Sequence, residues 1–251
     1  MPEHYIEFQN VSKAFGENRV LQEINFFVDP GETLVIMGRS GVGKSVTLGH
    51  IMGFLKPDVG RVWVAREDIT DYSESELERI RKKVTMVFQS GALFDSLTIF
   101  ENVAFPLREQ RDWTDEHIEE IVLGLLELLE IRELADSLPS ELSTGMKRAA
   151  AIARALAAQP EAILYDEPTT MVDPLMSQHI GELIKKLKYQ LKLTSVVVTH
   201  DTRLARKVAD RIMFLEGGHG IFFGTIAELS ACSDPFIREF LQQDELASLS
   251  R

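Results

Sequence analysis

The stretch GRSGVGKS, residues 38–45, decides the fold of this chain. It fits the pattern G-x-x-x-x-G-K-[ST] and lies between an apolar, strand-forming run and a helical pattern from Lys44 to Leu55. In such a loop the backbone N–H groups wrap phosphates, the lysine reaches the β- and γ-phosphates, and the last hydroxyl is offered to Mg²⁺. A plain glycine turn does not explain Lys44. The predicted phosphate-binding residues are Gly38, Arg39, Ser40, Gly41, Val42, Gly43, Lys44 and Ser45.

A second predicted site follows the apolar run Ala162–Tyr165, which carries Asp166 and Glu167 at a strand end. One carboxylate can hold the metal together with Ser45, and the next can orient or deprotonate water. Two adjacent acids are often only a solvated pair, but the strand before them and Pro168 after them favour the functional interpretation. Kinases and GTPases share both features, so these residues predict a Mg-dependent nucleoside triphosphatase and no more.

Length and composition limit the other possibilities. The 251 residues favour one α/β domain with an insertion. The net charge of −12 argues against a surface that follows DNA or lies on anionic lipid, so no nucleic-acid partner is expected. The one cysteine, Cys232, excludes an internal disulfide and favours a reducing compartment. The start MPEHYIEF lacks a signal-peptide pattern, and no uncharged apolar run reaches the roughly 18 residues of a membrane span.

Strand and helix patterns alternate along most of the chain, which predicts a largely parallel sheet covered on both sides. A mostly helical block from about residue 90 to Leu138 interrupts this alternation. The tail from Thr225 is also helical and places four apolar side chains on one face, so it must pack against something. These side chains are Phe236, Ile237, Phe240 and Leu241.

The stretch ELSTGMKRAAAIARAL, residues 141–156, begins a further helix behind Ser143, Thr144 and Gly145. Free N–H groups, a hydroxyl and a glycine that lets another molecule approach predict a second anion site. Ser45 and Asp166 are 121 residues apart, and Ser143 precedes Asp166 by 23 residues. With the helical block between these motifs, the chain resembles the ATPase subunits of ABC (ATP-binding cassette) transporters over nearly its whole length.

This resemblance implies one ABC ATPase domain over residues 1–251: a RecA-like α/β core with a helical subdomain at about 90–160 and a helical tail at about 225–251. It implies ATP and Mg²⁺ as cofactors and a head-to-tail homodimer in which Ser143 to Gly145 grip the partner's γ-phosphate. Thr144 stands where the family usually has Gly, and Met146 where it usually has Gln. A β-branched Thr crowds the approach, so a lower turnover rate is expected.

Other family positions carry over one by one. Gln89 matches the glutamine that contacts metal and water and links the site to the helical subdomain. Glu167 matches the residue that activates water, and His200 the histidine that contacts the γ-phosphate. Phe15 matches the aromatic that stacks on adenine, with a core phenylalanine as the alternative. Asp173 is kept in the D-loop, although Met171-Val172 replace its usual small-residue-Leu pair.

Flanking segments are most similar to the Mla-type ATPases, which energise permeases working with MCE-domain proteins to move lipids between membranes. These segments include VFQSGALFDSLTIFENVAFPLRE and the ending DPFIREFLQQ. The implied partners are an integral membrane permease, an MCE-domain lipid-binding protein and a small accessory subunit, and the implied location is peripheral, at the cytoplasmic face of the inner membrane. Alternatives are an amino-acid importer ATPase, a soluble ABC protein acting on DNA or the ribosome, and a non-catalytic regulatory cassette.

The apolar stretch from Gln89 to Pro106 predicts a groove for a short helix of the permease. Its large side chains are too closely spaced for all of them to face one core, although filling the helical subdomain is the alternative. They include Leu93, Phe94, Leu97, Ile99 and Phe100.

Overall fold

The computed structural model describes residues 3–110 and 113–249, with the backbone alone for 243–249. Within these residues the larger sheet has the strand order β10-β9-β3-β8-β7-β6. The strands from β9 to β6 run parallel and β10 pairs antiparallel with β9, as the alternating sequence pattern predicts for most of the sheet. The strands are β3 Thr33–Met37, β6 Val84–Val87, β7 Ala162–Asp166, β8 Thr194–Thr199, β9 Arg211–Glu216 and β10 His219–Thr225.

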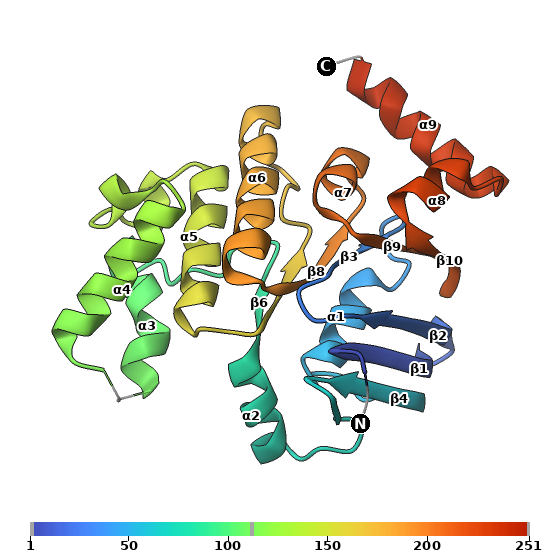
Figure 1. The fold of residues 1–251 in the computed structure, drawn as a ribbon, viewed down its shortest axis with the longest axis horizontal. Coiled ribbons are helices and arrows are strands. Elements are labelled where there is room, and N and C mark those ends of the chain that lie inside the picture. The colour runs from blue at the N-terminus through green and yellow to red at the C-terminus, as the bar shows by residue number, and fades with distance from the viewer. Residues whose placement is uncertain (1–2, 111–112, 250–251) are drawn as a thin grey trace.

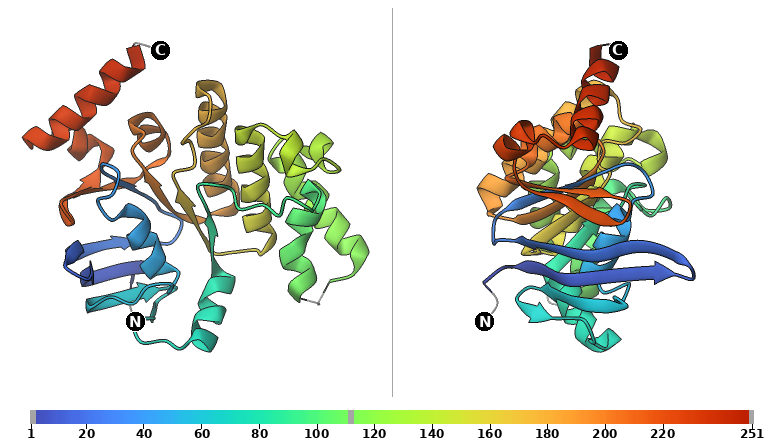
Figure 2. Two further views of the ribbon diagram at one scale, coloured as in Figure 1. Left: turned by 180° about the vertical axis from the view of Figure 1, so that it is seen from behind. Right: turned by 90° about the vertical axis from the view of Figure 1, so that its right-hand side faces the viewer.

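A smaller antiparallel sheet in the order β2-β1-β4-β5 lies beside the parallel one (Figure 1; Figure 2, right). Its first two strands form a hairpin whose turn includes Gly16 in the left-handed region at φ 62°. The sequence pattern showed strands here but did not reveal that they form a separate sheet. The strands are β1 Ile6–Phe15, β2 Asn18–Val28, β4 Val59–Val64 and β5 Glu67–Asp68.

The parallel sheet separates two apolar cores because successive side chains of a strand point to opposite faces. Leu34 and Ile36 of β3 face the core shared with α1 (Lys44–Ile51) and the antiparallel sheet. Val35 and Met37 face the opposite core, which is filled by helices from Ile99 onward. The helices that flank the two sheets include α2 Glu74–Lys83, α5 Thr144–Ala157, α6 Pro174–Leu191, α7 Thr202–Val208, α8 Ile226–Ala231 and α9 Pro235–Leu249.

A group of helices projects from one end of the molecule (Figure 1, green). It contains α3 (Ile99–Gln110), α4 (Asp115–Leu128) and α5, with the 3-10 turns Arg132–Leu134 and Pro139–Glu141 between α4 and α5. Residues 91–98 form a loop, so the helix begins later than the apolar stretch suggested. All these elements lie within the range 90–160 predicted for the helical subdomain, a division that stays a prediction.

The C-terminal tail packs on the parallel sheet, which accounts for its apolar face. Ile237 is fully buried, and Phe236 and Phe240 meet Phe214 of β9 edge-on at centroid distances of 6.1 and 4.9 Å. The surface that the tail was expected to need is therefore provided by β9. Residues 250–251 of the predicted tail lie outside the described residues.

Candidate nucleotide-binding and hydrolysis site

The predicted site residues leave neighbouring parallel strands at one edge of the sheet. Met37 pairs with Thr199, Asp166 with Val198, and Val87 with Tyr165. Consequently each predicted group follows one of four neighbouring strands. The loop from Gly38 follows β3 and His200 follows β8. Asp166 and Glu167 lie at the end of β7, and Gln89 follows β6. Ligands of open α/β sheets bind at the carboxyl ends of such strands.

The loop of residues 38–43 has a backbone that only glycines adopt easily. Gly38 has φ 147°, and a Cβ there would lie 2.4 Å from the carbonyl oxygen of Leu215. Gly43 has φ 107° and forms the N-cap of α1 without a side-chain capping bond, so the first N–H groups of this helix stay available to an anion. Gly41, by contrast, has open space beside it, where a phosphate group can approach.

Lys44 closes this loop from inside. Its side chain is 7% exposed, and its Nζ donates to the carbonyl oxygens of Gly38 at 2.9 Å and Arg39 at 3.0 Å. The same ammonium group lies 3.4 Å from the Glu167 carboxylate. The loop therefore surrounds a cation of the kind that can pair with a phosphate chain.

Ser45 and Asp166 meet although they are far apart in the sequence. The Ser45 Oγ donates to Asp166 Oδ1 at 3.0 Å. Burial and the neighbouring Glu167 raise the pKa of Asp166, a free-energy cost that a bound cation would offset. The two oxygen ligands suit Mg²⁺, which usually takes one or two protein ligands and completes its shell with phosphates and water. The described residues contain no cluster of three or more His, Cys, Asp or Glu that could hold a metal ion.

Glu167 is held in a fixed orientation beside the metal pair. Its backbone is left-handed, with φ 47°, and its N–H donates to the carbonyl oxygen of Val198 at 2.9 Å. Its carboxylate accepts from Thr170 Oγ1 at 3.2 Å and lies 2.9 Å from His200 Nδ1. Burial opposes its ionisation, but the hydrogen bond with His200 and the charges of His200 and Lys44 outweigh burial and lower the pKa of Glu167. An ionised carboxylate held in this way can serve as a general base, the role that stays a prediction for Glu167.

Gln89 and Phe15 are both exposed. Phe15 is 47% exposed at the end of β1, with the Lys13 ammonium 5.6 Å from its ring centre. It is therefore not the core phenylalanine that the sequence left as an alternative. Its stacking on adenine and the contact of Gln89 with the metal stay predictions, as do the individual phosphate contacts of Ser40 and Val42.

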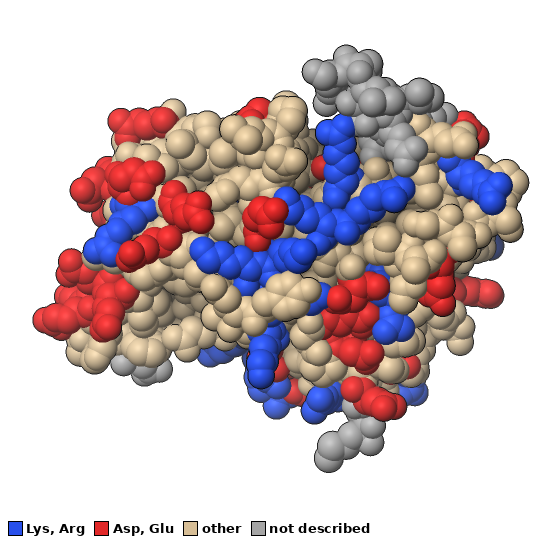
Figure 3. Space-filling model, turned by 45° about the horizontal axis from the view of Figure 1, so that its top comes forward, with Lys and Arg blue, Asp and Glu red and all other residues tan. Residues whose placement is uncertain are grey.

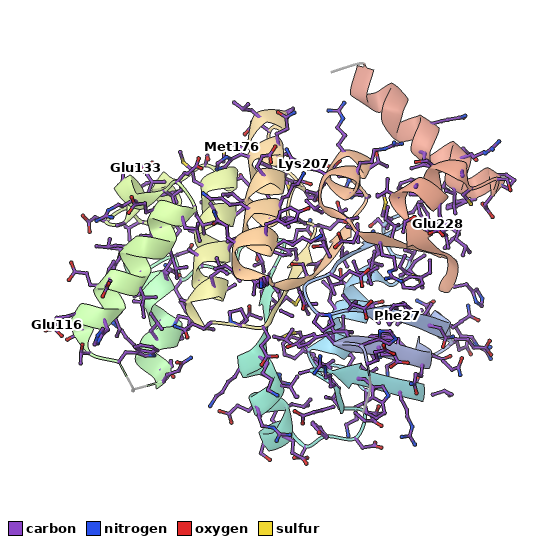
Figure 4. All side chains as sticks on the ribbon, viewed as in Figure 1. Phe27, Glu116, Glu133, Met176, Lys207 and Glu228 are labelled. Carbon is purple, nitrogen blue, oxygen red and sulfur yellow. The ribbon has the colours of Figure 1, made fainter. Side chains whose placement is uncertain are left out.

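Ser143 and Thr144 begin α5 on the other side of the sheet from α1. The Ser143 Oγ caps the helix by accepting from the N–H of Met146 at 3.3 Å, and Thr144 is exposed. The space beside Gly145 is already filled, because a Cβ there would lie 2.7 Å from Met176 of α6 (Figure 4). A larger residue would therefore clash with α6 here, and the role of Gly145 in admitting the partner's phosphate stays a prediction. Asp173 caps α6 in the same way, accepting from Met176 N–H at 3.0 Å.

Three side chains that shape the site were not among the residues predicted from the sequence. Thr170 donates to the Glu167 carboxylate. Arg148 donates to the carbonyl oxygen of Phe88, just before Gln89, and Asn102 donates to that of Phe94, after it. The sequence did hold a signal for two of them, because buried polar groups need partners. Arg148 lies inside the alanine-rich run of α5, and Asn102 lies inside an apolar helix.

Comparison with known proteins agrees with this geometry. The family model for ABC transporters matches residues 21–170. The chain belongs to the ABC transporter ATPase family. It is 40% identical over 242 residues to the intermembrane phospholipid transport system ATP-binding protein MlaF of Haemophilus influenzae, covering 96% of this chain and 92% of that protein. It is 36% identical to the methionine import ATP-binding protein MetN of Clostridium tetani, covering 96% of this chain and 76% of that protein.

A probable ribonucleotide transport ATP-binding protein, mkl, of Mycobacterium leprae is 36% identical over 94% of this chain and 68% of its own length. Among solved structures, a dimeric ATP-binding cassette bound to ADP and Pi is 35% identical with a TM-score of 0.81, covering 88% of this chain and 98% of that one. The cbiO1 subunit of Clostridium perfringens is 26% identical with a TM-score of 0.85 over 99% of both chains.

These relationships confirm the predicted fold, a RecA-like α/β core with an inserted helical subdomain. The chain is an ABC ATPase that binds ATP and uses Mg²⁺. No helix in the described part of the chain is long and apolar enough to cross a membrane.

Proposed function

We propose that this chain hydrolyses ATP to drive a membrane permease that moves phospholipids or related lipids between membranes. The observation that carries the chemistry is the convergence of Ser45, Asp166, Glu167 and His200 at one sheet edge. The similarity to MlaF over 92% of its length supports the lipid cargo. The protein would lie peripherally, at the cytoplasmic face of the inner membrane.

In this proposal each residue has one task. The loop N–H groups and Lys44 bind the phosphates, and Ser45 and Asp166, with Gln89, would hold the Mg²⁺. When bound, the metal neutralises charge on the β- and γ-phosphates. Glu167 would accept the proton of the attacking water. His200, whose Nδ1 lies 2.9 Å from Glu167, would contact the γ-phosphate.

The site needs a second copy of the chain. Ser143 and Thr144 begin α5, which packs against α3, α4, α6 and β6, whereas α1 packs against β4, β7 and β8 on the opposite face of the sheet. The two anion sites therefore face different directions within one chain. A head-to-tail homodimer, supported by the dimeric cassette relative, would bring Ser143 of one copy to the nucleotide of the other.

The permease would dock beside the helical subdomain. Of the apolar side chains predicted to form a groove, Ile99 is fully buried, while Leu93 and Phe100 pack on the core. Phe94 is 45% exposed, and its ring centre lies 4.9 Å from that of Phe105, which is 40% exposed, with the two rings tilted by 50°. These two rings form an exposed aromatic surface that can accept a short helix of a membrane partner.

A charge change on this surface tests the docking. Phe94→Asp should abolish pull-down of the permease and leave ATP binding intact, because the ring lies outside the nucleotide site. Tyr189→Asp on α6, where the side chain is 67% exposed, is the matched control and should retain pull-down. Equal pull-down by both variants would contradict the groove.

The cargo is tested on the assembled complex. Mass spectrometry of the copurified complex should find phospholipid, and turnover in proteoliposomes should respond to lipid acceptors. A complex without lipid, whose turnover responds to amino acids, would instead favour the importer function named for the MetN relative. Copurifying proteins would also show whether an MCE-domain protein and a small accessory subunit are partners.

The surface charge supports a protein rather than a nucleic-acid partner. Figure 3 shows Lys and Arg gathered across the middle of one face and a group of Asp and Glu at its left edge. Several cations of α6 and α7 are already paired, such as Lys207 with Glu182 at 2.7 Å and Lys188 with Asp210. Paired cations and a net charge of −12 both disfavour binding to the phosphate backbone of a nucleic acid. We therefore still predict no nucleic-acid partner.

A further inference from the structure

Asp58 lies immediately before β4 and fastens the end of β1. Its carboxylate accepts from the Ala14 N–H at 2.7 Å and from the Lys13 ammonium group at 2.8 Å. Its own N–H donates to the carbonyl oxygen of Ser12 at 2.9 Å. One residue therefore bonds to three successive residues of β1, although it lies 44 positions beyond the last of them.

These bonds continue a strand pairing that stops before β1 does. The pairing of β1 with β4 ends at Ser12 and Val59, whereas its pairing with β2 continues to the end of β1. Beyond Ser12 the side chain of Asp58 takes the place of a strand partner and satisfies the N–H of Ala14. The end of β1 is therefore held on both sides, by β2 and by Asp58.

Phe15 follows directly at this end of β1. The residue is 47% exposed, so much of it remains open to another molecule. The Lys13 ammonium group, which Asp58 holds, lies 5.6 Å from the ring centre, within the range of a cation–π interaction. Asp58 thus fixes both the backbone before the ring and the cation beside it.

The same hairpin lies against the phosphate-binding loop. Lys13 pairs with Leu21 of β2. A Cβ on Gly43 would lie 2.7 Å from the Leu21 side chain and 3.0 Å from the carbonyl oxygen of Val20. The place of Phe15 relative to the phosphates is therefore set by β2, and its position at the strand end by Asp58.

We propose that Asp58 is a positioning residue for nucleotide affinity, which holds the Phe15 ring for adenine through its bonds to Ala14 and Lys13. The inference rests on the proposed function, in which the loop binds ATP, and on the predicted stacking of Phe15. Stacking of a base on an aromatic side chain strengthens binding by roughly five- to 150-fold. A ring that is free to move offers this surface for only part of the time, so part of the gain depends on Asp58.

Calorimetric titration of the full chain with a non-hydrolysable ATP analogue and with inorganic tripolyphosphate, both with Mg²⁺, tests this role. Asp58→Ala should weaken binding of the analogue by about threefold or more. Binding of tripolyphosphate, which has no base, should not change.

Asp68→Ala is the matched control. Asp68 belongs to β5, at the edge of the same sheet, and also accepts from a cation and a backbone N–H, those of Arg61 and Thr70, each at 3.1 Å. This variant should bind both ligands like the parent chain. A loss of analogue affinity as large as that of Asp58→Ala overturns the proposal.

Combination with Phe15→Ala shows whether Asp58 acts through the ring. In the Phe15→Ala background, Asp58→Ala should cause no further loss of analogue affinity, a result that a general effect on the sheet would not produce. Equal losses in both backgrounds overturn the proposal. If Asp58→Ala does not fold, Lys13→Met breaks the pair from the other side and keeps an unbranched stem, so analogue affinity should fall by about twofold or more.

Phe15→Ala alone separates this inference from the proposals beneath it. If it binds the analogue like the parent, the stacking prediction is wrong and the role of Asp58 falls with it, while the phosphate site stands. If it weakens binding and Asp58→Ala does not, stacking stands and only the role of Asp58 fails. A parent chain that binds neither ligand would contradict the nucleotide site itself and this inference with it.

Discussion

Glu167 combines a left-handed backbone with a largely buried carboxylate whose pKa is lowered. A non-glycine residue at φ 47° is uncommon and persists only where its surroundings enforce it. Here the bond to Val198, the Thr170 hydroxyl and the His200 ring do so. The proposed base is thus held in place before substrate binds. A conservative substitution should therefore remove the proton acceptor without disturbing the backbone around it.

Glu167→Gln tests that chemistry. The amide cannot accept the proton of water, so turnover should fall by about 10²- to 10⁴-fold, while ATP binding and the fold persist. Steady-state hydrolysis of the assembled transporter and nucleotide affinity measure the two effects. Near-normal hydrolysis would remove Glu167 from this role.

The pair of His200 and Glu167 makes stability depend on pH. The hydrogen bond with Glu167 raises the pKa of His200 above 6.5. The stabilisation that comes from protonated His200 is therefore complete below pH 6.5 and is lost as pH rises through the folded-state pKa. The pKa of Glu167 lies below 4.5, so its contribution is present above pH 4.5 and is lost as pH falls through the folded-state pKa.

The stabilisation by this pair is therefore greatest between about pH 4.5 and 6.5. Because the His200 side chain is 58% exposed, solvent screening limits the effect to about 0.5 kcal/mol. Urea unfolding of the parent and His200→Gln at pH 5.5 and pH 9 checks this. The difference between the two proteins should be larger at pH 5.5, and a constant difference would exclude the pair as its source.

Thr144 tests the altered signature sequence. Its side chain is exposed at the first position of α5, where the partner's phosphate is expected to approach. Thr144→Gly removes the crowding Cβ substituents and should increase turnover of the assembled complex a few-fold. A clear fall would show instead that the Thr144 hydroxyl contributes to binding.

At the scale of elements, Asn102 holds the loop that presents Phe94. The side chain is fully buried in α3 and accepts from the Phe94 N–H at 2.8 Å. Its Nδ2 lies within bonding distance of the carbonyl oxygens of Phe94, Leu97 and Thr98, at 3.0–3.1 Å. One side chain therefore contacts four backbone polar groups of a loop that has no regular secondary structure.

Asn102→Ala should lower the free energy of unfolding by about 2–3 kcal/mol, because these buried groups lose their partner. Pull-down of the permease should weaken as the loop loosens. Gln190→Ala, at an exposed position of α6, is the control and should change stability by less than about 0.5 kcal/mol. If denaturant melts of the two variants coincide, the loop does not depend on Asn102.

At the scale of the whole molecule, the tail is part of the main core. Fully buried Ile237 belongs to the core that also contains Val35 and Met37 of β3. Through Phe236, whose ring lies 4.9 Å from the Arg39 guanidinium, the tail also contacts the phosphate-binding loop. Stability of the sheet and of the site should therefore depend on α9.

Ile237→Ala should destabilise the chain by about 3 kcal/mol, the usual cost of such a cavity. Gln242→Ala, an exposed position on the same helix, should have almost no effect. Thermal unfolding of both variants checks the prediction. A melting temperature unchanged by Ile237→Ala would mean that α9 unfolds separately from the sheet.

The sequence alone predicted those parts of the molecule that depend on local spacing. The phosphate-binding loop, the acidic strand end and the α5 start each require a few residue types in a short segment, because backbone geometry and phosphate chemistry act locally. The alternating strand and helix patterns likewise predicted the parallel sheet. The order of these motifs along the chain was enough to indicate the family.

Only the tertiary structure decided which distant residues meet. Ser45 and Asp166 contact one another because β3 and β7 both flank β8, a strand order that no local pattern encodes. The packing of Met176 beside Gly145 and the burial of Arg148 beside Phe88 depend in the same way on how helices cross the sheet. Such contacts arise from long-range packing of side chains, whose partners a linear sequence does not specify.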